Sequence, residues 1–220
     1  MFFPANVKAK ALSQRAEFGP ISCITVRYPQ LLPPYEDRAS NDKMINFLDH
    51  FVHPHSLLKF LGGPIESLFV ARSPIGSATV TFQFKSGAIG NLLYSVGQSA
   101  SSFYERTEII GDGENIVIDN NIRVTFYRKA PPVGYGRSGD YFELFDDATA
   151  PLQWEPEFSL GQLHNKGLFL LGYAQEIIHF TTRLLDGKGP EWGTLDDALE
   201  LMLIYEAYRK SDGAVHFIGK

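Results

Sequence analysis

The chain has 220 residues, of which 44% are hydrophobic, 20% charged and 13% aromatic, and its formal net charge at pH 7 is -5. This composition is typical of a folded globular protein and excludes an intrinsically disordered chain. The negative charge and the lack of a long basic run exclude nucleic acid as the expected partner, because binding it requires a basic face.

Three features of the sequence bear on its compartment. No segment reaches the roughly 18 uninterrupted apolar residues of a membrane span. The opening MFFPANVKAK lacks the basic and apolar regions of a signal peptide. The only cysteine, Cys23, excludes an intrachain disulfide and suits a reducing compartment. We therefore expect a cytoplasmic protein with no membrane partner.

The first quarter of the chain predicts a helix, a strand and a loop. Residues 5–17 have the composition of a short helix that ends before a Gly-Pro pair. Residues 21–28 are β-branched and bounded by prolines, which indicates a strand. Residues 30–41 carry prolines and several charges and predict a loop.

The next segment, FLDHFVHPHSLLKFLGG (residues 47–63), holds three of the six histidines. Its apolar flank and its Gly-Gly-Pro ending predict a helix. Asp49 and His53 are four residues apart, so in a helix both side chains leave the same face. A carboxylate that orients an imidazole forms a workable proton-transfer pair. Pro54 predicts a kink just after His53 or a new helix that starts there.

Two other interpretations of this segment remain open. His50 and His55 are also explained as helix-surface or hydrogen-bonded histidines without a functional role. Asp49, His50, His53 and His55 are all of metal-ligand type, but no third ligand cluster with recognisable spacing follows.

The middle of the chain changes to a period of two, which indicates a sheet with one covered and one polar face. Short strands are expected over residues 65–72, 78–84, 88–96, 104–110, 116–119 and 123–128. No helix separates them, so the sheet should be mostly antiparallel. Residues 130–163 predict a surface excursion with an edge strand near Trp154.

Two helices and a short strand are expected at the end. Residues 166–185 predict one helix with a stripe expected in the core, formed by Leu170, Tyr173, Ile177, Phe180 and Leu184. Thr194 is a natural N-cap for the last helix, whose buried face is expected to hold Leu199, Met202 and Leu203. Residues 214–218 predict a final strand. The sequence therefore indicates a single α+β domain over residues 1–220, with a large, mostly antiparallel open β-sheet and helices packed on one face.

The segment from Gly134 to Gly139 satisfies the dinucleotide pattern G-x-G-x-x-G. That chemistry requires the glycines between a buried strand and the first turn of a helix. Here two prolines precede the motif and no convincing helix follows it. We interpret the segment as a loop and expect no cofactor-binding residues in this chain.

The order of these elements resembles the C-terminal domain of the Gfo/Idh/MocA oxidoreductases, which has a glyceraldehyde-3-phosphate dehydrogenase-like fold. The stretches that carry the resemblance are PANVKAKAL, FGPISCITVRYP, DHFVHPHSLLKFLGGPIESL, ATVTFQFKSGAIGNLLYS, TEIIGDGENIVIDN, EIIHFTTRLLDGKGP and TLDDALELMLIYEAYRKSDG. Together they cover most of the chain.

The resemblance implies a site. The family's D-x-x-x-H pattern falls on Asp49 and His53, so His53 would accept the proton of a substrate hydroxyl and Asp49 would orient it or bind the sugar. Ser56 stands where many members have an aspartate. By the same resemblance, Tyr28, His55 and Tyr104 are weaker candidates for sugar contacts, since each is also explained by packing.

The resemblance also implies partners. The family binds NAD or NADP mainly through an N-terminal Rossmann domain, which this chain lacks. We therefore expect no cofactor on this chain alone and no hydride transfer by it. The expected ligand is a sugar or polyol such as a cyclitol. The open sheet face is expected to bury itself in a homo-oligomer, a dimer or tetramer.

Two rival functions stay open. The first is a non-catalytic binding or assembly module that uses the sheet face as an interface. The second is a metal-dependent hydrolase built on the histidine cluster, which would bind zinc.

Overall fold

The computed structural model describes residues 1–29, 34, 36–37, 41–73, 77–95, 98–99, 101, 104–129, 150–156, 166–211 and 213–219. The side chains of residues 41–47, 49 and 166 lie outside this description. The glycine-rich segment from Gly134 to Gly139, interpreted above as a loop, also lies outside the described residues.

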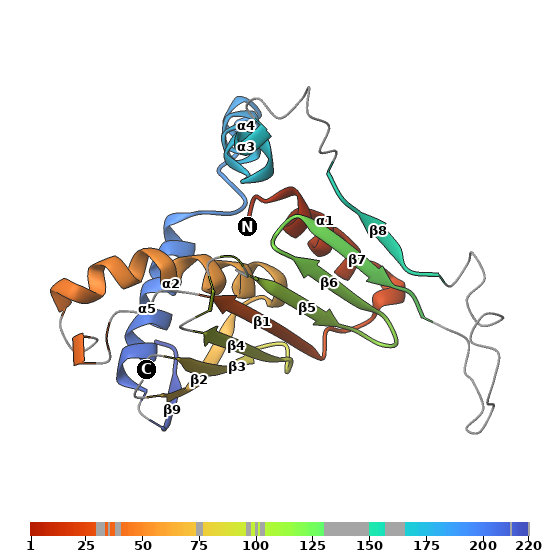
Figure 1. The fold of residues 1–220 in the computed structure, drawn as a ribbon. Coiled ribbons are helices and arrows are strands. Elements are labelled where there is room, and N and C mark those ends of the chain that lie inside the picture. The colour runs from red at the N-terminus through yellow and green to blue at the C-terminus, as the bar shows by residue number, and fades with distance from the viewer. Residues whose placement is uncertain are drawn as a thin grey trace, which may run out of the picture.

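A nine-stranded sheet forms one layer of the molecule (Figure 1). The strands are β1 (Cys23–Pro29), β2 (Ile65–Arg72), β3 (Ala78–Phe84), β4 (Ile89–Ser95), β5 (Arg106–Ile110), β6 (Asn115–Asp119), β7 (Arg123–Tyr127), β8 (Leu152–Trp154) and β9 (Val215–Phe217). Their spatial order is β8-β7-β6-β5-β1-β4-β3-β2-β9. The edge strand expected near Trp154 is confirmed as β8, and the strand expected at the end of the chain is confirmed as β9, which forms the other edge of the sheet.

Only β1 and β4 pair in parallel; the other described pairs are antiparallel. This confirms the mostly antiparallel open sheet. β3 shows why the sheet has two different faces, because buried Val80 and Phe82 alternate with the half-exposed or exposed residues Thr79 and Thr81.

Helices cover the buried face of the sheet. The helical elements are α1 (Pro4–Ser13), the 3-10 turn η1 (Ala16–Phe18), α2 (Asn41–Gly62), α3 (Lys166–Leu170), α4 (Tyr173–Leu185) and α5 (Leu195–Lys210). α1 contacts β6 and β7, α2 contacts β1 and β4, and α5 contacts β2 and β9. The core lies between these three helices and the sheet.

Helix α2 runs without interruption through Pro54. The sequence predicted a kink or a new helix start there, because proline removes a helix hydrogen bond at a cost of about 3 kcal/mol. Around the proline, Phe51, Leu57 and Leu58 are at most 3% exposed. We attribute the continuous helix to this burial, since each such side chain contributes about 1.5–3 kcal/mol.

Polar contacts fix the position of α5. Thr194 and Asp197 form a capping box at its start, which confirms the predicted N-cap. Lys59 of α2 pairs with Asp197 and, at 2.9 Å, with Glu200. At the other end, the Arg72 guanidinium donates to the carbonyl oxygens of Ser211 and Tyr208. These contacts attach α5 to both α2 and β2.

The predicted burial of the closing helices was wrong. The expected single helix is two, α3 and α4, separated at Gly172, whose φ is +83°. No residue of α4 is buried, and the stripe side chains Tyr173, Ile177, Phe180 and Leu184 are 48–64% exposed. Figure 1 shows this helix pair beyond the layer formed by α2 and α5, beside the N-terminus.

The buried face of α5 also differs from the prediction. Leu199, Met202 and Leu203 are exposed, and the buried residues are Leu201, Ile204, Ala207 and Tyr208. The helix is thus rotated relative to the expected orientation. Among the described residues, no helix has both the length and the apolar character needed to cross a bilayer.

Candidate functional site

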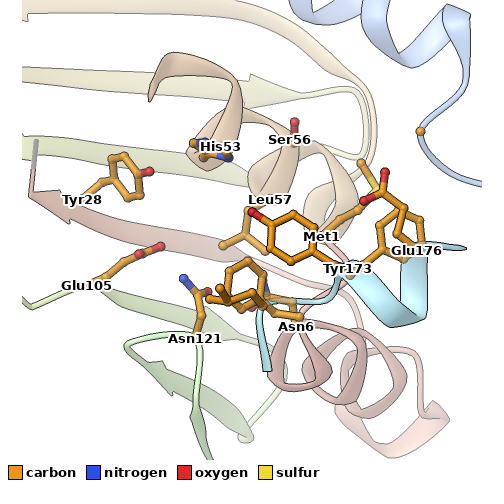
Figure 2. A pocket seen from close by; sticks show the side chains of 14 residues that line it. Met1, Asn6, Tyr28, His53, Ser56, Leu57, Glu105, Asn121, Tyr173 and Glu176 are labelled. Carbon is orange, nitrogen blue, oxygen red and sulfur yellow. The ribbon is translucent and has the colours of Figure 1, made fainter. Parts of the chain in front are cut away.

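A cavity of about 380 Å³ opens between α2, the N-terminal segment, the β5–β7 end of the sheet and the α3–α4 pair. Figure 2 shows its side chains. It is lined by Met1, Phe2, Phe3, Asn6, Tyr28, His53, Ser56, Leu57, Glu105, Asn121, Leu171, Tyr173, Glu176 and Gly193. A volume near 400 Å³ is in the range of small-molecule sites.

Among the described residues that line the cavity, His53 is the only histidine. It is exposed, whereas Phe51 and Leu57 on the same helix are buried in the core. The helix is therefore anchored on one side and presents an imidazole to the cavity on the other. An imidazole in this setting can exchange a proton with a bound hydroxyl.

The Asp49 side chain lies outside the described residues, although α2 is helical through this position. Its spacing of four residues from His53 places both on one helix face. The pairing of Asp49 with His53 therefore stays a prediction.

His55 lies in the core and does not line the cavity. It is 0% exposed and stacks on Phe51 with ring centroids 3.6 Å apart. Its Nδ1 atom lies 2.8 Å from the Phe51 carbonyl oxygen and 3.0 Å from the Tyr94 hydroxyl. Burial lowers the pKa of His55 to about 3, although the contact with Phe51 opposes this shift. His55 is therefore placed where a neutral imidazole fills an aromatic cluster.

The two tyrosines named from the sequence lie in different places. Tyr28 lines the cavity, and its ring packs edge-on against Tyr94 at 6.2 Å. The Tyr104 hydroxyl instead donates to the Asp119 carboxylate and accepts from Arg106 at 3.1 Å. Its ring lies under the Arg27 guanidinium, and Tyr104 is not among the cavity-lining residues.

Glu105, Asn121 and Glu176 line the cavity but were not identified from the sequence. Glu105 follows Tyr104 directly, and successive side chains of a strand point to opposite faces of the sheet. Because Tyr104 points away from the helices, Glu105 points toward them. Asn121 belongs to the Asp-Asn-Asn turn between β6 and β7. A polar residue at a hairpin tip usually faces solvent, so the sequence around Asn121 did not indicate a binding site.

Among the described residues, no group of three or more His, Cys, Asp or Glu side chains that could hold a metal ion comes together. A dinucleotide is bound on a glycine-rich turn before a helix. The described lining residues of the cavity include no such turn.

The sequence places this domain, an α+β sheet with a histidine helix beside a cavity, in a known family. Residues 6–117, just over half of the chain, match the GFO/IDH/MocA C-terminal domain. The chain belongs to this family, which confirms the resemblance seen in the sequence. A search of curated proteins found no match.

Solved structures of longer oxidoreductases share the fold. An NAD-binding oxidoreductase from Klebsiella pneumoniae is 14% identical with a TM-score of 0.72, and the match covers 100% of this chain and 64% of that one. Levoglucosan dehydrogenase in complex with NADH and levoglucosan is 14% identical with a TM-score of 0.68, covering 96% and 62%. GenD2 from gentamicin A biosynthesis, in complex with NAD, is 20% identical with a TM-score of 0.63, covering 100% and 62%.

This chain therefore spans about three fifths of the length of the oxidoreductases it resembles. At these identities the likeness establishes the fold alone.

Proposed function

We propose that this chain is the substrate-binding and oligomerisation domain of an NAD- or NADP-dependent dehydrogenase that acts on a sugar or polyol. The observation that carries the proposal is His53, which a helix anchored in the core on its other side presents to a cavity of about 380 Å³. Family membership and the similarity to levoglucosan dehydrogenase support it.

In this proposal His53 accepts the proton of the substrate hydroxyl, and Asp49 orients the imidazole or binds the sugar. Tyr28 and Ser56 lie in the same cavity and can hydrogen-bond further hydroxyls. The nicotinamide cofactor would accept the hydride, and it would be bound mainly by a separate Rossmann domain, as the family resemblance implies. The chain alone is then not expected to catalyse the reaction.

The test measures polyol oxidation by this chain joined to a nicotinamide-binding domain, with a panel of neutral sugars and cyclitols. His53→Asn should lower kcat by about 100-fold to 10,000-fold, the usual contribution of a general base. His50→Asn is the matched control, since His50 is exposed on the same helix but does not line the cavity. Equal losses in both variants, or no loss in His53→Asn, would refute the assignment.

The oligomerisation part of the proposal concerns the sheet face that the helices leave open. Ile89, Cys23 and Ile110 are register partners on β4, β1 and β5, so they form a row across that face. Ile89 and Ile110 are 49% and 38% exposed, and Leu93 is 37% exposed on the same face. Exposed apolar side chains on a sheet suit burial against a second copy.

Sedimentation of the purified chain tests this. The wild type should form a dimer or tetramer, and Ile89→Lys with Leu93→Lys should give a folded monomer. A monomeric wild type at tens of micromolar would refute the interface. A non-catalytic assembly module is the second candidate, and it would keep the oligomer while the polyol assay shows no dependence on His53.

A further inference from the structure

Glu105 and Asn121 form a polar pair on the cavity wall opposite α2. In Figure 2 their side chains lie side by side, across the cavity from His53 and Ser56. They come from different places in the sequence, since Glu105 precedes β5 and Asn121 lies in the turn between β6 and β7.

The turn that carries Asn121 is tight and well defined. Asn120 and Asn121 have φ values of +50° and +54°, and the Ile122 N–H donates to the Asp119 carbonyl oxygen at 3.0 Å. Two central residues with positive φ characterise a type I′ turn, for which asparagine is one of the favoured residues, and Ile122 completes the three-residue connection between the register partners Asp119 and Arg123.

This turn is bonded directly to residue 105. The Glu105 N–H donates to the Asn120 Oδ1 atom at 2.8 Å, and the Asn120 N–H donates to the Glu105 carbonyl oxygen at 2.8 Å. The Asn121 side chain also hydrogen-bonds the Glu105 carboxyl group. Two contacts therefore fix the Glu105 backbone against the turn, and the contact with Asn121 holds its carboxyl group.

The fixed carboxylate keeps unused acceptor capacity. A carboxylate offers about four lone-pair positions, and the bond from Asn121 uses one of them. Two adjacent hydroxyl groups of a sugar or cyclitol can donate to one carboxylate together. Burial raises the pKa of Glu105, whereas the Asn121 bond opposes the rise.

The charges around the cavity are unfavourable for an anion. Its described lining contains two carboxylates, Glu105 and Glu176, but no lysine or arginine. A phosphate or carboxylate on the ligand would meet repulsion in a partly desolvated space.

We propose that Glu105, held by Asn121, is a specificity-determining residue that accepts hydrogen bonds from adjacent hydroxyls of a neutral polyol and disfavours phosphorylated or carboxylated sugars. The inference rests on the proposed function, because it assigns the substrate class of the same cavity. It assigns Glu105 a role in binding, while the proton transfer remains with His53.

Ligand-observed NMR titrations of the 220-residue chain test the inference. The probes are myo-inositol and glucose as neutral polyols, with glucuronate and glucose 6-phosphate as anionic counterparts. The variant is Glu105→Gln, which keeps the shape but removes the charge. Glu108→Gln is the matched control, since it lies three residues along the same segment on the other side of the sheet, bonded to Asn115 at 3.0 Å.

The wild type should bind at least one neutral polyol about tenfold or more tightly than either anion. Glu105→Gln should weaken polyol binding by about tenfold and reduce the discrimination against glucuronate, since a hydrogen bond to a charged group is lost. Glu108→Gln should change neither affinity. Circular dichroism should show that all three proteins are folded.

The outcomes separate the two proposals. If neutral polyols bind but Glu105→Gln binds them as well as the wild type, or if the anions bind equally well, only the role of Glu105 is refuted. If neither neutral nor anionic sugars bind the wild type, the proposed sugar site fails and the role of Glu105 fails with it.

Discussion

His53 and His55, two positions apart on α2, lie on opposite sides of the helix. His53 lines the cavity, and His55 is buried in the core. Two residues correspond to a rotation of about 200° on a helix. The Nε2 atom of His55 has no hydrogen-bond partner among the described residues, so protonation would place an unpaired N–H in an aromatic cluster. The two imidazoles should therefore respond differently to acid.

The first prediction concerns the pH dependence of stability. The folded-state pKa of His55 is about 3, below the ordinary value of 6.5, so the unfolded chain binds more protons between these pH values. The contribution of neutral His55 to the free energy of unfolding is complete above pH 6.5 and is lost as pH falls toward 3. Over this range the free energy of unfolding should fall by up to about 1.4 kcal/mol per pH unit. Urea unfolding at several pH values measures this slope, and the His55 ring signals should stay constant from pH 8 to 4.

The second prediction contrasts two isoleucines on neighbouring helices. Ile204 of α5 is 0% exposed, so Ile204→Ala should lower the free energy of unfolding by about 2–5 kcal/mol. Ile177 of α4 is 64% exposed, and Ile177→Ala should change it by no more than about 0.5 kcal/mol. Chemical denaturation of both variants checks this, and similar losses would show that the α4 stripe is buried in the isolated chain.

The third prediction uses a close backbone approach. A Cβ atom at Gly111 would lie 2.3 Å from the Phe18 carbonyl oxygen, so Gly111→Ala should destabilise the fold by about 1–3 kcal/mol. At Gly189 no heavy atom lies within 4 Å, so Gly189→Ala serves as the control and should leave stability nearly unchanged. Thermal melts of the two variants distinguish them, and equal melting temperatures would contradict the packing of η1 against the Gly111 turn.

The fourth prediction concerns the start of α5. The Thr194 hydroxyl accepts from the Asp197 N–H at 3.1 Å, and Thr194→Ala should cost about 1 kcal/mol of unfolding free energy. In α4 the Thr181 hydroxyl donates back to the Ile177 carbonyl at 2.7 Å, a bond that does not cap a helix end. Thr181→Ala should therefore be close to neutral, and a loss as large as that of Thr194→Ala would argue against the capping role.

Local pattern was sufficient for much of the fold. The period-two alternation around Val80 and Phe82 identified the sheet and its buried face, and the Thr194 cap identified the start of the last helix. These predictions succeeded because they depend on neighbouring residues. They required no knowledge of contacts with residues that are distant in the sequence.

The errors arose where the partner of a surface had to be known. The stripe through Ile177 and Phe180 has ideal spacing for packing, but spacing alone does not say whether the surface it packs against belongs to this chain. The site shows the same limit. The spacing of Asp49 and His53 selected one helix face, whereas Glu105 and Asn121 meet only because the β6–β7 turn folds back on residue 105.

The position of β1 bears on how the chain acquires its structure. β1 is the first strand in the sequence but pairs with β4 on one side and β5 on the other, and it alone joins the two antiparallel halves of the sheet. During synthesis it leaves the ribosome well before either partner exists. Its exposed edges would then be open to wrong pairing until both halves have formed, so docking of β1 is expected to be a late and slow step.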